Sequence, residues 1–163
     1  METFVKVSAK TKRETYLEII PQIKALVEGE TNLVANLANV TSALKLAFPS
    51  ISWVGFYLIE GNQLVLGPFQ GKPACVRIAI GKGVCGTSAH KQMTIIVQDV
   101  EKFPGHIVCD PDSKSEIVIP IIRGSQVLGV LDVDSAALST FDETDKSYLE
   151  ELCTWLSKNV FTN

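Results

Sequence analysis

The spacing of apolar residues changes at Pro49, and this change constrains the possible folds more than any other feature of the sequence. Before Pro49, apolar residues recur every three or four positions over residues 11–28 and 33–48, which is the spacing of an amphipathic helix. After Pro49 they alternate along short stretches, as in half-buried strands. Because the helical spacing returns after Asp142, the sequence predicts two helices, a group of strands and a closing helix.

The expected helices carry recognisable end signals. The first begins with the capping-box spacing of Thr11 and Glu14, and it contains Pro21, which predicts a kink or a break. The second ends at Pro49, and Asp142 caps the third. The apolar stripes expected on the three helices are Leu17, Ile20, Ile23 and Leu26; Leu33, Val34, Leu37, Val40, Leu44 and Phe48; and Tyr148, Leu149, Leu152, Leu156 and Val160.

The middle of the chain has the pattern of short strands separated by turns. Strands are expected over residues 52–58, 63–66, 75–80, 94–97, 116–122 and 126–133. The first two form a hairpin through Gly61-Asn62, and segment 75–80 is expected to alternate cleanly between two faces. This order predicts an α+β fold over residues 1–163, a single domain with a six-stranded antiparallel sheet and helices packed mainly on one face.

Composition narrows the class of partner. A chain of 163 residues with 46% hydrophobic and 20% charged residues is expected to form one globular domain. A net charge of −3 and a pI near 5.4 argue against binding to nucleic acid or to an acidic membrane. The N-terminus lacks the apolar region of a signal peptide, and no apolar stretch is long enough to span a bilayer. We therefore expect a cytoplasmic protein that acts on a small molecule or binds another protein.

Three of the four cysteines, Cys75, Cys85 and Cys109, lie close together in the sequence among Gly, Asp and Ser residues. In a reducing compartment, thiols grouped in this way are more often catalytic or metal-binding than structural. Cys85 is expected near the start of a short helix, where the helix dipole favours the thiolate. Cys109 lies in a polar loop, and from the residues alone it is either a nucleophile or an ordinary half-buried thiol. Cys153 is expected to be a core residue of the last helix.

Three familiar motifs are excluded by their context. Residues 81–86 read G-x-G-x-x-G, but segment 81–93 is too short for the helix of a dinucleotide-binding crossover. The acidic residues of 110–116 do not form an EF-hand, because Lys114 and Ser115 occupy positions that require an oxygen ligand and a glycine. His90 and His106 could complete a Cys₃His zinc site, but no C-x₂₋₄-C spacing supports one. We expect no metal and no cofactor.

Two pairs of residues are each expected to project from one face of a strand. Asp132 and Asp134 flank Val133, and two carboxylates that close raise at least one pKa, which allows a neutral acid near pH 7. The alternative is ordinary turn chemistry after the strand. Trp53 and Tyr57, four residues apart, are expected to be core aromatics on one face of a strand.

Several spaced motifs resemble one family. GPFQGKPACVRIAIGKGVCG, GHIVCD, SEIVIPI and GVLDVDS are similar to the free methionine-(R)-sulfoxide reductases, which are single-domain GAF proteins, over about Trp53 to Asp145. The resemblance implies that Cys109 attacks the sulfoxide and that Glu116 and Asp134 are catalytic acids. It also implies a binding site for free methionine sulfoxide. The substrate-binding residues would be Trp53, Tyr57, Asp132, Glu116 and Asp134.

The resemblance also implies a redox cycle. The sulfenic acid formed on Cys109 condenses with a second cysteine, either Cys75, which we favour, or Cys85, and a thioredoxin-type protein reduces the disulfide. The preference for the R stereoisomer and a possible homodimer come from the resemblance alone. Two rivals are a non-catalytic GAF ligand sensor, although the Asn-Lys-Phe-Asp nucleotide signature is absent from the sequence, and a cysteine peroxidase.

Overall fold

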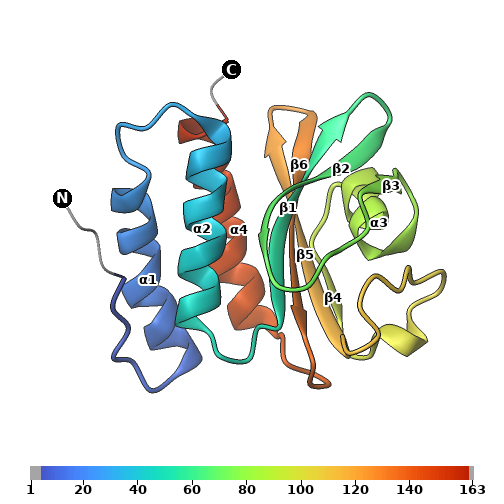
Figure 1. Ribbon diagram of the computed structural model, residues 1–163, viewed down its shortest axis with the longest axis horizontal. Coiled ribbons are helices and arrows are strands. Elements are labelled where there is room, and N and C mark those ends of the chain that lie inside the picture. The colour runs from blue at the N-terminus through green and yellow to red at the C-terminus, as the bar shows by residue number, and fades with distance from the viewer. Residues whose placement is uncertain (1–4, 162–163) are drawn as a thin grey trace.

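The computed structural model describes residues 5–161 and contains four α-helices and one six-stranded sheet within that range. The expectation for the N-terminus rests partly on residues 1–4, which lie outside the described residues, as do 162–163. Three helices cover one face of the sheet and the fourth covers the other (Figure 1). The three are α1 (Lys12–Leu26), α2 (Leu33–Ala47) and α4 (Glu143–Asn159), and the fourth is α3 (Gly83–Lys91).

The sheet has the strand order β3-β2-β1-β6-β5-β4, and each neighbouring pair is antiparallel. Its strands are β1 (Trp53–Glu60), β2 (Gln63–Gln70), β3 (Arg77–Ala79), β4 (Ile95–Val97), β5 (Ser115–Arg123) and β6 (Gln126–Ser135), with a 3₁₀ turn at Val100–Lys102. The predicted fold class is therefore confirmed. The strands on either side of the G-x-G-x-x-G segment, β3 and β4, lie at opposite edges of the sheet, so the segment does not connect a dinucleotide-binding βαβ unit.

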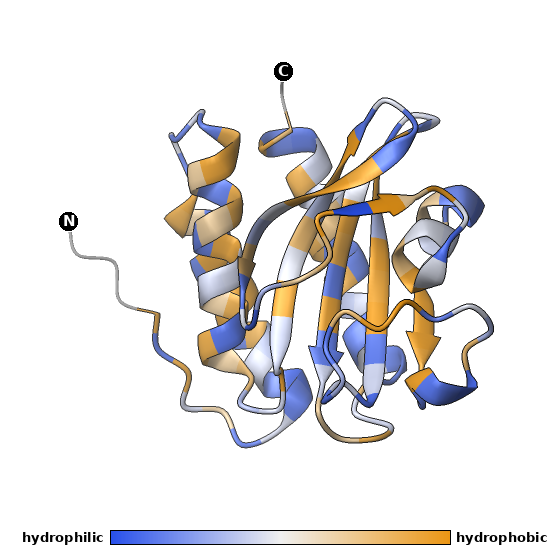
Figure 2. Cartoon of the chain, turned by 45° about the vertical axis from the view of Figure 1, so that its right-hand side comes forward, coloured by the Kyte–Doolittle hydropathy of each residue, from blue (hydrophilic) through white to orange (hydrophobic). Residues whose placement is uncertain are grey.

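Apolar side chains form two clusters, one on each face of the sheet. Figure 2 shows hydrophobic residues concentrated along the strands and on the helix faces turned toward them. The larger cluster fills the space beneath α1, α2 and α4, and it includes Cys153, which is buried as predicted. The smaller cluster lies between the sheet and α3 and contains Trp53, Tyr57 and Cys85. No helix among the described residues is both long and apolar enough to cross a membrane.

The helix ends agree with the sequence, but parts of the apolar stripes do not. Thr11 and Glu14 form the expected capping box. Pro21 does not break α1, because it lies on the solvent side, where water can bond the carbonyl that proline leaves free. Leu17 and Val34 are exposed rather than buried. In α1 the buried stripe instead contains Tyr16, Ile19, Ile20 and Ile23.

The strand expected over residues 75–80 is shorter than predicted. Only Arg77–Ala79 pairs with β2, and Cys75 lies in the loop that precedes β3. The Cys75 carbonyl accepts a hydrogen bond from the Tyr57 hydroxyl at 2.8 Å, whereas the next carbonyl, that of Val76, still accepts one from the Leu66 N–H of β2 at 2.9 Å. Val76 is exposed while Ile78 is buried, so the two do not share one buried face.

Candidate active site

Antiparallel register aligns three of the predicted site residues in one row across the sheet. Asp134 of β6 lies opposite Trp53 of β1 on one side and opposite Glu116 of β5 on the other. Two residues earlier on β6, Asp132 lies on the same face and opposite Gly55. Residues far apart in the sequence are thus brought together by strand pairing, and the face that carries them is the one covered by α3.

The indole of Trp53 is held in place by its neighbours. It stacks on Phe69 and on Tyr57, with ring centroids 5.4 and 6.1 Å apart, and its Nε1 donates a hydrogen bond to the Lys72 carbonyl at 3.0 Å. Gly55 leaves room for the ring, because a Cβ there would lie 2.3 Å from Trp53 Cη2. Trp53 and Tyr57 are therefore packed residues that also face the site.

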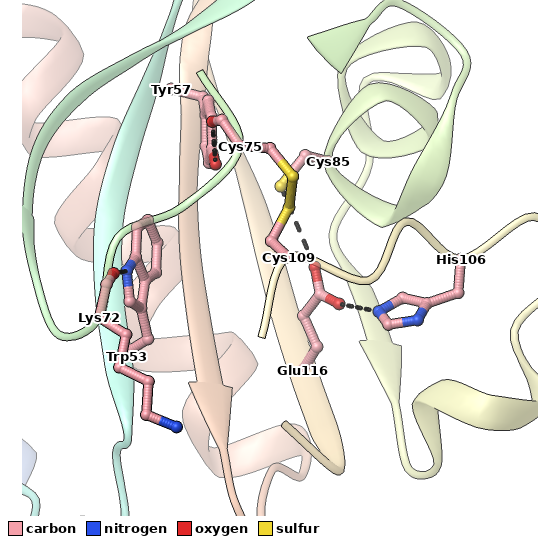
Figure 3. Close-up of a disulfide and its surroundings, with 8 residues drawn as sticks. All are labelled: Trp53, Tyr57, Lys72, Cys75, Cys85, His106, Cys109 and Glu116. Atoms are coloured by element: carbon pink, nitrogen blue, oxygen red, sulfur yellow. Dashed lines mark hydrogen bonds and ion pairs between the residues drawn. A yellow bond between two sulfur atoms is a disulfide. The ribbon is translucent and has the colours of Figure 1, made fainter. Parts of the chain in front are cut away.

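The cysteines come from three different segments (Figure 3). Cys75, before β3, and Cys109, before β5, form a disulfide with their Cα atoms 5.5 Å apart. The resemblance left both Cys75 and Cys85 as candidates to pair with Cys109, and Cys75 is the one that we favoured. Cys85, in the first turn of α3, is a free, buried thiol, and its Sγ lies 4.0 Å from Glu116 Oε1.

These groups line one pocket, which lies between the sheet, α3 and the two loops that carry Cys75 and Cys109, here called the cysteine loops. It is lined by Trp53, Tyr57, Cys85, Cys109, Glu116, Asp132 and Asp134, which include every predicted site residue except Cys75. Cys75 is bonded to Cys109 at the mouth of the pocket. The pocket thus places a disulfide next to two buried carboxyl groups, those of Glu116 and Asp132, and the partly buried carboxyl group of Asp134.

A family model described as a GAF domain matches residues 30–157 of this sequence. The chain belongs to the GAF domain family. It is 54% identical over 149 residues to GAF domain-containing protein A of Dictyostelium discoideum, covering 91% of this chain and 94% of that protein. It is 45% identical over 151 residues to the free methionine-R-sulfoxide reductase of Escherichia coli, covering 93% and 92%.

A solved structure gives the same relationship. The free methionine-R-sulfoxide reductase from Neisseria meningitidis, in complex with its substrate, matches this GAF domain with a TM-score of 0.94 and 48% sequence identity. The match covers 97% of this chain and 95% of the other. The resemblance inferred from the motifs is therefore confirmed.

Burial controls the charge state of the acids in this GAF domain. Desolvation, followed by repulsion from Asp132, raises the pKa of both Glu116 and Asp134 well above the ordinary range. Desolvation raises the pKa of Asp132 less, to about 6, because hydrogen bonds from Cys85 and Glu116 favour its charged form. Burial thus favours the neutral form of Glu116 and Asp134, whereas Asp132, with a pKa of about 6, is largely ionised at pH 7.

The expectation of a Cys85 thiolate is not supported. Burial, followed by the nearby charges of Asp132 and Glu116, raises the pKa of Cys85 well above its ordinary value. The helix dipole at the first turn of α3 is too weak to offset the loss of hydration. Cys85 is therefore a neutral thiol at pH 7.

Two neighbours of the site were not predicted to act there. The Nε2 atom of His106, considered above only as a zinc ligand, lies 3.7 Å from Glu116 Oε2, and burial lowers the pKa of this histidine. Lys72 Nζ forms ion pairs with Asp110, at 3.2 Å, and with Asp112, which link the two cysteine loops. The only signal for either residue was its position inside a family motif.

The structure does not assemble the zinc site considered from the sequence. Cys75 and Cys109 are joined to each other, and the compact group that could hold an ion is instead Cys85, Glu116 and Asp132, whose ligand atoms lie within 4.8 Å of one another. A metal there would require the buried thiol to ionise. The same groups suit proton transfer and the binding of an ammonium group without a metal.

Proposed function

We propose that this single catalytic GAF domain, spanning residues 1–163, reduces free L-methionine (R)-S-oxide to L-methionine. The observation that carries the proposal is the Cys75–Cys109 disulfide at the mouth of a pocket lined by buried carboxyl groups. Reduction of a sulfoxide requires a nucleophilic thiolate and an acid that protonates the oxygen. Relatives at about 45% identity that carry the name free methionine-R-sulfoxide reductase support the same activity.

The first half-reaction uses Cys109 and the protonated acids. The Cys109 thiolate attacks the sulfoxide sulfur while Glu116 or Asp134 donates a proton to the oxide oxygen. The attack forms a bond between the two sulfur atoms; the protonated oxygen then moves from the substrate sulfur to the Cys109 sulfur as that S–S bond breaks. The substrate sulfur thereby gains two electrons, the cysteine sulfur loses two and becomes a sulfenic acid, and methionine leaves. Since both acids have raised pKa values, each can hold the proton that this step consumes at neutral pH.

The second half-reaction closes the disulfide. The Cys75 thiol attacks the sulfenic sulfur of Cys109, and the hydroxyl group leaves as water after taking up the thiol proton. Because the Cα atoms of the two cysteines are 5.5 Å apart when bonded, the loops that carry them need no separate partner for this step. Cys85 lies deeper, and we assign it a relay or substitute role only.

The charged ends of the amino acid have separate partners in the pocket. The Oδ1 atom of Asp132 is buried with no hydrogen-bond partner among the described residues, so it is free to accept from the substrate ammonium. The first turn of α3 has no side-chain cap, and its N–H groups at Gly83, Val84 and Cys85 suit the carboxylate. The methyl-sulfur end then lies against Trp53.

Binding of the ammonium should depend on pH through Asp132. With a pKa of about 6, this carboxyl is ionised at pH 7 and becomes protonated as the pH falls through 6. We therefore expect KM for free methionine sulfoxide to rise several-fold between pH 7 and pH 5, and the Asp132→Asn variant to have a high KM that changes little over this range. Steady-state kinetics at fixed ionic strength measure both. A wild-type KM that is constant from pH 5 to pH 7 would contradict this role.

The regenerating reductant is proposed to be thioredoxin. Each cycle leaves a disulfide, and in a reducing cytoplasm, where we place the enzyme, a thioredoxin-type dithiol restores the two thiols. NADPH oxidation with thioredoxin, thioredoxin reductase and each free methionine sulfoxide enantiomer tests the function. A ligand sensor would consume no NADPH, and a peroxidase would prefer hydrogen peroxide. The homodimer implied by the resemblance is tested by light scattering.

The two candidate resolving cysteines are distinguished by one variant. Cys75→Ser should still release about one methionine per enzyme in a single turnover, because Cys109 is intact, but it should cycle poorly with thioredoxin. Rapid-quench measurement of methionine, followed by steady-state turnover, separates the two steps, and Cys85→Ser is the matched control. Normal cycling of Cys75→Ser would transfer the resolving role to Cys85.

A further inference from the structure

Three large apolar side chains are exposed beside the disulfide. Val76, directly after Cys75, is 63% exposed, and Val108, directly before Cys109, is 65% exposed. Ile107, at the edge of the pocket, is 37% exposed. Because the disulfide holds the two cysteine loops together, these side chains lie around one pair of sulfur atoms. We call Val76, Ile107 and Val108 the apolar rim.

The nearest charged groups on the same loops are paired with one another. Lys72 forms ion pairs with Asp110 and Asp112, and Arg77 forms one with Glu60 at 3.3 Å. These charged side chains are themselves exposed, but each has a partner within the protein, whereas the exposed apolar side chains have no such pairing. Apolar residues exposed together in this way, next to a reactive group, mark a contact surface more often than scattered ones do.

The reductant must approach the disulfide from the side of the rim. The opposite side is closed by the pocket floor, where Cys85 of α3 and Glu116 of β5 are buried between the helix and the sheet (Figure 3). Thiol–disulfide exchange requires the attacking thiolate to reach one sulfur directly, so access decides the rate. A protein reductant, which cannot enter the pocket, has to contact the loops that carry the two cysteines.

We propose that the apolar rim of Val76, Ile107 and Val108 is the docking surface for the thioredoxin-type dithiol protein that reduces the Cys75–Cys109 disulfide. This inference rests on the proposed function, and it adds where the reductant binds. The disulfide between the apolar side chains selects this occupant, because a partner that covered the rim without a thiol would block turnover. A small apolar contact also suits a redox partner that has to leave after each cycle.

At this surface, thiol–disulfide exchange transfers the disulfide from the enzyme to the docked protein in two steps. A thiolate of the docked protein bonds to one enzyme sulfur, and the other enzyme cysteine leaves as a thiolate. The second thiol of the docked protein then displaces the first enzyme cysteine. The enzyme regains two thiols, and the docked protein takes the disulfide and leaves the rim.

The test compares a protein reductant with a small one. In the Val76→Ser/Val108→Ser double variant, we expect kcat/KM for thioredoxin to fall by about tenfold or more, because apolar contact is lost at the centre of the interface. Turnover driven by dithiothreitol, and KM for free methionine sulfoxide, should not change, since neither valine lines the pocket. Val76→Ile/Val108→Ile, which keeps the apolar contact, should retain most of the thioredoxin-dependent rate.

Leu46→Ser is the matched control, because Leu46 is 70% exposed on α2, on the opposite face of the sheet. It should alter neither assay. The proposal would be overturned if the serine double variant kept a kcat/KM for thioredoxin within twofold of wild type, or if it lost equally much activity with dithiothreitol. It would also be overturned if the wild-type enzyme turned over with dithiothreitol but not with thioredoxin. Failure of the proposed function gives a different result, namely that wild-type enzyme forms no methionine with dithiothreitol.

Discussion

Replacing Cys109 by serine is expected to abolish the reduction of free methionine-(R)-sulfoxide and to leave the fold intact. A serine hydroxyl is almost fully protonated near pH 7 and is a far weaker nucleophile than a thiolate, so we expect kcat to fall by more than about 10³-fold. Cys109 is half-buried in a loop, and its side chain is not part of either apolar cluster. The loss should therefore be chemical rather than structural.

The measurement is methionine release in a single turnover, with the stability of the variant followed by thermal unfolding. Reduced wild-type enzyme is the correct reference, because the Cys75–Cys109 disulfide itself contributes to the stability of the oxidised form. Cys153→Ser is a useful control, since it changes a buried thiol of the helical layer without touching the pocket. Activity of the Cys109→Ser variant above a few per cent of wild type would place the nucleophile at another cysteine.

The spacing of apolar residues in the sequence predicts most of the fold, but it predicts the arrangement of the site residues only in part. The same-face position of Asp132 and Asp134 is a consequence of strand geometry and needs no further information. Their alignment with Trp53 and Glu116 depends on how three strands pair, which the apolar pattern of each strand does not determine. The family motifs supplied that relationship instead.

The errors around the site have a common physical origin in contacts between residues distant in the sequence. Cys75 leaves the expected strand because its carbonyl bonds the Tyr57 hydroxyl and its sulfur bonds Cys109. The thiolate expected at Cys85 rests on a local helix-end argument, and the burial of this residue between α3 and the sheet overrides it. The ion pairs of Lys72 join loops that are distant in sequence. Local periodicity carries no information on any of these contacts.

The acid role of Glu116 and Asp134 gives the second large effect. If each holds the proton that the oxide oxygen receives, Glu116→Gln and Asp134→Asn should each slow the chemical step by roughly 10²- to 10⁴-fold, the usual contribution of general acid catalysis. An amide preserves the size of the side chain and can donate a hydrogen bond, but it cannot release a proton. The two variants therefore separate proton donation from packing.

The effect should appear in kcat for free methionine-(R)-sulfoxide, with the reactivity of Cys109 toward an alkylating agent as the control for an intact nucleophile. The two residues are not equivalent, because Glu116 also accepts a contact from Cys85 and lies beside His106, whereas Asp134 occupies the centre of the cross-strand row. A larger loss in Glu116→Gln would therefore identify Glu116 as the main donor. Near-wild-type kcat in both variants would show that the buried carboxyl groups only position the substrate, and the proton would then have to come from solvent.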